Sequence, residues 1–398
     1  MATFTSKIAW TANDGNHRRG RSPDKEKDNF LRVQLFTMAL NGIRKHETVS
    51  SRIYFYGCFL TMLIMDLAGV HFAYQNAGEI LLVCDCLGPT FTCFLGVVKQ
   101  YYLDVHREQL WYIIHELRKL KQNATVSDIE MIEKNNKIDQ FLATAYFASS
   151  MGTGTIFIVE AILKGTYNYF IRNCIEWNLP IAISFPFDIS HPAIFAFFFI
   201  WCSAATYMVV FSSVSSDAGF GGLASNLVVH FKILQNRFKD RRFEDDDQSL
   251  EDLIEYHTLV LKLSRRLMSS FRIIILNNLL VASVLLCVLG FEMVVYLGTS
   301  LMLLYITYIT AIVIQIFFFS YYGSQLLYES AAVGDAIYCS NWYEATPKTR
   351  KLLLFCIKRA QVPVNTKVGI MVASLPTFRA IVNSAGSYVA LLLSFTED

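Results

Sequence analysis

Aromatic and hydroxyl side chains recur inside long apolar segments of this 398-residue chain. Tyr305 and Tyr308 stand at positions i and i+3, so they share one face of a predicted helix. Three other apolar segments hold the remaining members of this set: Leu87, Thr90, Phe91, Ser150, Thr153, Phe157, Met208 and Ser212. An apolar wall with a few hydroxyls suits a small volatile organic ligand, because burial of such a ligand rests on dispersion and desolvation. Ordinary packing between helices explains any single one of these residues equally well.

The sequence carries none of the common motifs for catalysis, metal binding or cofactor binding. It has no HExxH, no GxSxG and no Gly-rich phosphate loop. Gly219-Phe220-Gly221-Gly222 is more typical of a bend at the inner end of a helix than of a phosphate cradle. Cys84-Asp85-Cys86 has no second Cys or His pair nearby to complete a metal site. We therefore expect a protein that is not an enzyme and that uses no metal and no cofactor.

Four acidic residues lie within or near the apolar segments, where burying a charge is costly. Glu160 and Glu292 stand near the expected outer ends of two segments, so hydration is the simplest explanation for both. Asp66 and Asp85 lie deeper. We expect these two to face the interior of a helix bundle or a water-filled cavity rather than lipid.

These side chains are positioned by apolar segments long enough to cross a membrane. Apolar residues make up 54% of the chain and charged residues only 17%, against about a quarter in soluble domains. Seven segments of near-membrane length follow one another, at 53–74, 80–102, 141–163, 193–214, 273–296, 301–322 and 368–395. Because they are continuously apolar rather than alternating, helices are favoured over strands. The sequence predicts an all-α integral membrane protein with seven transmembrane helices.

The distribution of Lys and Arg orients these helices, because cytoplasmic loops carry the excess of positive charge. From the N-terminus onward, the segments before, between and after the spans hold 10, 0, 7, 2, 9, 0, 6 and 0 Lys and Arg residues. The alternation places the N-terminus inside and the C-terminus outside.

Amphipathic helices are also predicted on the cytoplasmic side. Leu110, Ile113, Ile114 and Leu117 form a helical stripe in the first cytoplasmic connection, between spans two and three. A helix from Ser249 to about residue 296 and a short helix around 352–357 add two further elements. The three suggest a packed cytoplasmic helical base, the alternative being helices that lie on the lipid surface.

The last thirty residues carry a pattern that resembles the final span of insect odorant receptors. It reads Ser374-Leu375-x-x-Phe378-x-x-Ile381, followed by Ser387-Tyr388, five apolar residues and Ser394-Phe395. The related gustatory receptors carry Thr-Tyr, five apolar residues and Gln-Phe, so Ser394 favours the odorant branch. The chain length, the seven-span topology and Asn341-Trp342-Tyr343 agree with this resemblance, which covers essentially the whole chain.

The resemblance implies an odorant-gated, non-selective cation channel, assembled as a tetramer around the last helix of each subunit. Such a subunit binds a small volatile ligand, works with an odorant co-receptor, and lies in the plasma membrane of olfactory sensory neurons. The co-receptor has a longer connection between spans four and five. Here the link at 234–249 is short, which indicates a ligand-tuning subunit.

The resemblance also assigns roles to residues. Spans two, three, four and six wall the family's ligand cavity, with Tyr305 and Tyr308 as the main candidates for ligand contacts. The residues at matching depth in this chain are Leu87, Thr90, Phe91, Ser150, Thr153, Phe157, Met208, Ser212, Tyr305 and Tyr308. The narrowest part of the pore falls at Leu391, Ser394 and Phe395, where Leu391 and Phe395 could form a dewetting gate. Arg379 is unusual in a cation pathway, and a wide cytoplasmic vestibule or a neighbouring subunit would accommodate it.

The resemblance implies three parts of the chain. These are a cytoplasmic segment at 1–52, helices one to six with the ligand pocket at 53–343, and an anchor helix with the pore helix at 344–398.

A gustatory receptor channel is the nearest alternative. A G-protein-coupled receptor would need an outside N-terminus, Asp-Arg-Tyr after span three and Asn-Pro-x-x-Tyr in span seven. The charge pattern contradicts the first requirement, and the sequence lacks both motifs.

Overall fold

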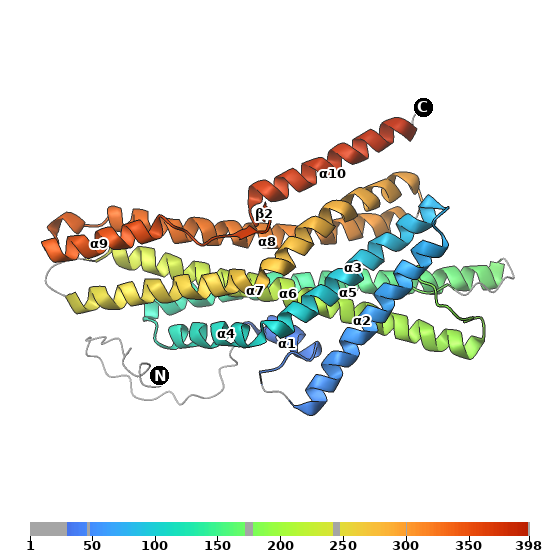
Figure 1. Ribbon diagram of the computed structural model, residues 1–398, viewed down its shortest axis with the longest axis horizontal. Helices are drawn as coiled ribbons and strands as arrows, with labels where there is room; N and C mark the ends of the chain where they lie inside the picture. The colour runs from blue at the N-terminus through green and yellow to red at the C-terminus, as the bar shows by residue number, and fades with distance from the viewer. Residues whose placement is uncertain (1–29, 46–47, 172–177, 242–246, 300, 397–398) are drawn as a thin grey trace.

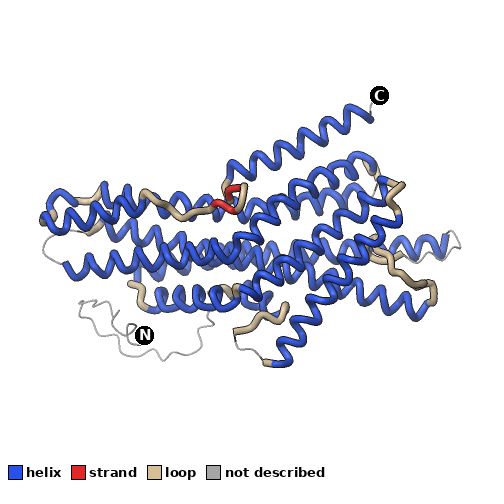
Figure 2. Tube along the Cα trace, viewed as in Figure 1, coloured by secondary structure: helices blue, strands red, loops and turns tan. Residues whose placement is uncertain are grey.

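The computed structural model describes residues 30–45, 48–171, 178–241, 247–299 and 301–396. These residues are almost entirely helical (Figure 2), as predicted. The helices are α1 (Arg32–Leu40), α2 (Val49–Gln75), α3 (Ile80–Val105), α4 (Arg107–Gln122), α5 (Val126–Ile171), α6 (Pro192–Lys239), α7 (Asp247–Val295), α8 (Leu301–Tyr338), the short 3-10 helix η1 (Trp342–Glu344), α9 (Pro347–Ala360) and α10 (Leu375–Thr396). One small antiparallel hairpin joins β1 (Lys367–Val368) to β2 (Met371–Val372).

Seven of these helices correspond to the predicted spans. Among the described residues, α2, α3, α5, α6, α7 and α8 are each long and apolar enough to cross a membrane. The 22-residue α10 supplies the seventh span. A helix satisfies every backbone hydrogen bond within its own segment, which is why continuous apolar segments adopt it in lipid. The predicted all-α, seven-helix class is confirmed.

The last span starts later than predicted, at Leu375 instead of residue 368. Residues 367–372 form the hairpin, in which Gly369 has a φ of 61°, a left-handed conformation that glycine adopts without a side-chain clash. The N–H of Ala373 then donates to the carbonyl of Thr366 at 2.9 Å. Residues 368–374 were predicted to belong to the last helix because they are apolar, and hydropathy alone does not distinguish an apolar hairpin from the start of an apolar helix.

Four helices are much longer than a membrane is thick. Helices α5, α6, α7 and α8 contain 46, 48, 49 and 38 residues. At 1.5 Å per residue, a 48-residue helix is about 72 Å long, against a hydrocarbon core of about 30 Å. Their surplus lengths gather with α4 and α9 at the left of Figure 1, and we call this assembly the helical base.

The amphipathic helices pack against the other helices of the base, which was one of the two predicted arrangements. The other was that these helices lie on the lipid surface. In α4, Leu110, Ile113 and Leu117 are each at most 3% exposed and belong to the main hydrophobic core. Helix α9 buries Leu353 and Cys356 in the same way. Burial of a continuous apolar stripe against other helices excludes the arrangement in which α4 lies on the lipid surface.

The glycines at 219–222 do not interrupt α6, which continues through them as one helix. A β-carbon on Gly222 would lie 2.5 Å from Cδ2 of Leu31. The missing side chain therefore lets α1 approach α6 closely. Close packing between helices accounts for a glycine at this position, a role that the sequence alone does not distinguish from a bend.

Buried and partly buried polar pairs tie the helical base together beyond the spans. The ring of His230 hydrogen-bonds to the hydroxyl of Tyr256 at 2.7 Å, and Arg237 pairs with Asp128 at 2.5 Å. Burial lowers the pKa of His230 to about 4, so the imidazole is neutral at physiological pH. A neutral ring can remain in the core without a counter-charge.

Candidate ligand-binding site

A cavity of about 120 Å³ lies between α3, α5, α6 and α8. Met65 of α2 and Ile181 of the segment before α6 complete its wall. The other lining residues are Pro89, Thr92, Cys93, Tyr146, Ser150, Thr153, Gly154, Phe157, Thr206, Val209, Val210, Ser213, Tyr308, Ala311, Ile312 and Gln315. Most of the wall is apolar, with hydroxyls and one amide at a few points. We call this space the inner cavity.

Four of the ten candidate ligand residues line the inner cavity: Ser150, Thr153, Phe157 and Tyr308. The ring of Phe157 meets the ring of Tyr308 edge-on, with centroids 5.7 Å apart. The Tyr308 hydroxyl donates to the carbonyl of Gly88 at 2.9 Å. That bond fixes the tyrosine ring as a rigid wall between α3, α5 and α8.

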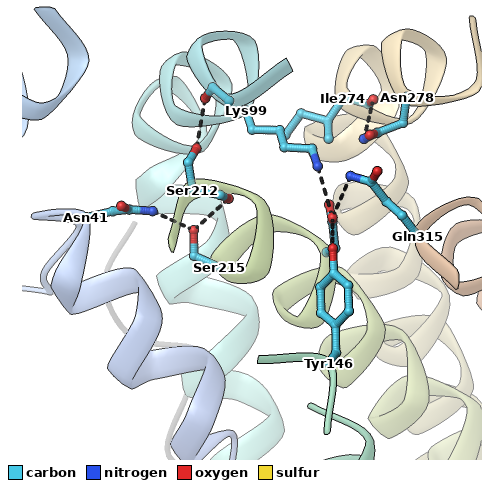
Figure 3. Close-up of polar contacts among 10 residues, drawn as sticks. Asn41, Lys99, Tyr146, Ser212, Ser215, Ile274, Asn278 and Gln315 are labelled. Atoms are coloured by element: carbon cyan, nitrogen blue, oxygen red, sulfur yellow. Dashed lines mark hydrogen bonds and ion pairs between the residues drawn. The ribbon is translucent and has the colours of Figure 1, made fainter. Parts of the chain in front are cut away.

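Five candidates line neither this cavity nor the neighbouring cavity of about 340 Å³: Leu87, Thr90, Phe91, Met208 and Ser212. Ser212 is fully buried, and its hydroxyl donates to the carbonyl of Gly96 at 2.8 Å (Figure 3). Thr90 lies at the contact of α2 and α3, close to Gly69.

Helix rotation explains these misplacements. On α3 the cavity is lined by Pro89, Thr92 and Cys93, whereas the sequence reading selected the face that carries Leu87 and Phe91. Two residues correspond to a turn of about 200° around a helix with 3.6 residues per turn. Because these segments are apolar on all sides, their sequence does not reveal which face turns inward.

Tyr305 lines a second cavity, of about 340 Å³, at the end of the bundle away from the helical base. Its hydroxyl donates to Asp85 at 3.0 Å, and that of Tyr296 donates to the same carboxylate at 3.3 Å. Asp85 thus faces a cavity, as expected. Phe157 lines both spaces, as do Pro89 and Ile181, so the two cavities adjoin.

Two charged residues lie deeper than predicted. Glu292 is 1% exposed, so hydration at a helix end does not explain it. One of its carboxylate oxygens has no hydrogen-bond partner among the described residues. Lys99 is one of the seven Lys and Arg residues that the charge pattern assigns to the connection between spans two and three, but its side chain is fully buried. Position relative to a helix end is therefore a poor guide to burial when a neighbouring helix covers that end.

Lys99 belongs to a buried polar network at one end of the inner cavity (Figure 3). Its ammonium group lies 2.9 Å from Oδ2 of Asp217, and neither side chain is exposed. The hydroxyl of Tyr146 and the amide nitrogen of Gln315 each donate to the same oxygen at 2.8 Å. The network joins α3, α5, α6 and α8, the four helices that wall the cavity.

The sequence reading missed this network, although it contained a signal for it. Lys99 and Gln315 are strongly polar side chains within apolar segments, and polar groups buried in a membrane need partners. The partner, Asp217, lies 118 positions from Lys99 along the chain, so only the folded structure shows the pairing. Tyr146 and Gln315 also line the inner cavity, which places the network in contact with any ligand there.

The candidate pore residues lie at the far end of α10. Leu391 is 53% exposed in the single chain. The side chains of Ser394 and Phe395 lie outside the described residues. Arg379 is exposed near the start of α10, while Ile381 and Ala385 form part of the face buried against the bundle.

Known proteins are similar to this chain in sequence and in fold. A family model described as 7tm Odorant receptor matches residues 79–386. Odorant receptor 82a of Drosophila melanogaster is 30% identical over an alignment of 338 residues, which covers 82% of this chain and 87% of that receptor. Odorant receptor 9a of the same fly is 27% identical over 385 residues, covering 93% and 97%. The solved structure of the insect olfactory receptor OR5 from Machilis hrabei in complex with eugenol has the same fold, with a TM-score of 0.77, 15% identity and coverage of 92% of this chain and 100% of that one. The present chain is a multi-pass membrane protein and belongs to the insect odorant receptor family.

Proposed function

We propose that this protein is the ligand-tuning subunit of an odorant-gated, non-selective cation channel. The observation that carries the proposal is the inner cavity, an apolar space with a few hydroxyls between four transmembrane helices. Such a space suits one small volatile molecule. Its residues Ser150, Thr153, Phe157 and Tyr308 are the proposed ligand contacts.

The proposed pore helix is coupled to this cavity through α8. Gln315 lines the cavity, and two residues further on the ring of Phe317 packs against Phe378 of α10, with centroids 5.5 Å apart. The hydroxyl of Ser324 accepts a hydrogen bond from the N–H of Leu375 at 2.9 Å, at the start of α10. A ligand that shifts α8 would therefore move the seat of the helix that carries Leu391, Ser394 and Phe395.

The helical base supports assembly into a tetramer. Tyr328, Tyr338, Leu354 and Phe355 on α8 and α9 are each at least 60% exposed. Their helices extend beyond the expected hydrocarbon core, so these apolar surfaces face neither lipid nor the chain's own interior, as expected for a contact with another subunit. We propose an odorant co-receptor as the partner, because the link at 234–249 is short.

The Lys and Arg pattern supports an inside N-terminus, an outside C-terminus and a cytoplasmic location for the helical base. In this proposal residues 1–52 are cytoplasmic, residues 53–343 hold helices one to six, and residues 344–398 hold the anchor and pore helices. The complex would act in the plasma membrane of olfactory sensory neurons.

The direct test is whole-cell and excised-patch recording from cells that express this chain with an insect odorant co-receptor. We expect small volatiles to evoke a cation current in excised patches, and little current when this chain is expressed alone. Odorant currents that require G-protein signalling and vanish in excised patches would contradict the channel and restore the G-protein-coupled class.

Tyr308→Ala tests the ligand contact. Removing this ring from the cavity wall is expected to cost on the order of 1–3 kcal/mol of binding, about a ten- to hundredfold loss of odorant sensitivity. Ile306→Ala is the matched control, since Ile306 lies on the same helix and is 40% exposed. A direct opener of the co-receptor should still evoke current in both variants. An unchanged odorant response in Tyr308→Ala would make this tyrosine a packing residue only.

A further inference from the structure

The polar network at the end of the inner cavity determines which hydrogen-bonding groups the cavity offers to a ligand. Asp217 accepts three hydrogen bonds or ion-pair contacts through one oxygen, and two of the donors, Tyr146 and Gln315, line the cavity. A carboxylate paired with a lysine only accepts hydrogen bonds. The Tyr146 proton and one of the two amide protons of Gln315 are therefore directed toward Asp217 and away from the ligand space.

The orientation of the Gln315 amide follows from this contact. Its nitrogen must face Asp217, because an amide oxygen in that place would face a negatively charged acceptor. The amide oxygen then points the opposite way, as Figure 3 shows. Gln315 thus presents a hydrogen-bond acceptor, and the Tyr146 oxygen is left as a second acceptor beside it.

Most other polar side chains of the wall have also committed their protons. Thr153 donates to the carbonyl of Ser149 at 3.1 Å, and Thr206 to that of Cys202 at 2.9 Å. On α3, the hydroxyls of Thr92 and Tyr308 hydrogen-bond to each other, and both lie within hydrogen-bond distance of the carbonyl of Gly88, at 3.1 Å and 2.9 Å. These contacts use the protons of all four hydroxyls. The lone pairs that remain make the wall rich in acceptors.

We propose that the inner cavity selects small odorants that donate a hydrogen bond, namely alcohols and phenols, over carbonyl compounds of the same shape. In this proposal, which rests on the odorant-gated function above, Asp217 is a positioning residue that sets the preference through Gln315 and Tyr146. A carbonyl odorant that meets these two oxygens would place its own oxygen against acceptors and leave them unpaired. A hydroxyl placed there finds the acceptor it needs.

The size of the cavity restricts the ligand further. Its volume of about 120 Å³ is of the same order as the roughly 150 Å³ apolar cavity that accommodates benzene in an engineered protein. Molecules with about six to eight non-hydrogen atoms are therefore the right probes. Suitable pairs with identical carbon skeletons are benzyl alcohol with benzaldehyde and cyclohexanol with cyclohexanone.

The test compares the half-maximal concentrations of the two members of each pair in cells that express this chain with a co-receptor. We expect the alcohol to be about tenfold more potent, the effect of one buried hydrogen bond gained against one acceptor left unpaired. Gln315→Met keeps the side-chain volume but removes the acceptor, so the ratio should fall toward one. Tyr146→Phe should lower the ratio as well, and serves as the readout if Gln315→Met does not reach the surface.

Thr310→Val is the matched control, because Thr310 is an exposed residue of α8 outside the cavity, where its hydroxyl donates to the carbonyl of Ile306. This variant should keep the wild-type ratio. A carbonyl member as potent as its alcohol in the wild type, or a ratio unchanged in both Gln315→Met and Tyr146→Phe, would overturn the ligand class while leaving the channel function intact. Silence toward all volatiles, with a normal response to a direct opener of the co-receptor, would instead overturn the odorant-gated function itself.

Discussion

Replacing Lys99 by alanine is expected to remove most of this protein from the cell surface. The substitution leaves Asp217 as a buried carboxylate whose side chain has no exposure to water. Breaking a buried ion pair by removing one partner costs about 3–5 kcal/mol, a large share of the stability of a folded domain. The loss should be visible as reduced surface biotinylation and a lower unfolding temperature of the detergent-solubilised protein.

A double substitution and a surface pair provide the controls. Lys99→Met combined with Asp217→Asn removes both charges, so much of the lost stability should return. Lys164→Ala breaks the ion pair with Glu160, in which the lysine side chain is 54% exposed, and an exposed pair contributes at most about 1 kcal/mol. If Lys99→Ala were as stable as Lys164→Ala, the buried pair would be energetically unimportant and the network would not hold the four helices together.

Gly323→Ala is expected to abolish most of the odorant-evoked current. A β-carbon at this position in α8 would lie 2.3 Å from the carbonyl oxygen of Ala373, two residues before α10. Neither atom belongs to a flexible side chain, so the backbone before α10 must move away from α8. Overpacking of this kind costs about 1–3 kcal/mol, and here it would displace the seat of the proposed pore helix.

Gly57→Ala is the matched substitution in α2, since a β-carbon there would meet nothing within 4 Å. It should be silent, or slightly stabilising because alanine favours helices by up to about 1 kcal/mol over glycine. Current density, normalised to surface protein, separates gating from expression. Normal currents in Gly323→Ala would show that the contact between α8 and the start of α10 does not control the pore.

The helices and the fold class could be predicted from the sequence. The seven spans, the amphipathic helices of the helical base and the extension of α7 beyond its span all appear in the pattern of apolar and charged residues. These features depend on local properties, since an apolar segment in lipid must form a helix whatever its neighbours are. The start of α10 was misplaced because a glycine turn and two short strands interrupt an apolar stretch without changing its hydropathy.

The rotation of each helix and the residues that it buries could not be predicted from the sequence and depend on contacts between helices. Four of the ten candidate ligand residues line the inner cavity, and Tyr305 lines the second cavity. Ser212 instead hydrogen-bonds to the backbone of a neighbouring helix. The Lys99–Asp217 pair could not be read from the chain either, because its partners are far apart in sequence. A helix that is apolar on all sides gains similar free energy in many rotations, and the choice among them rests on packing and on polar contacts between helices.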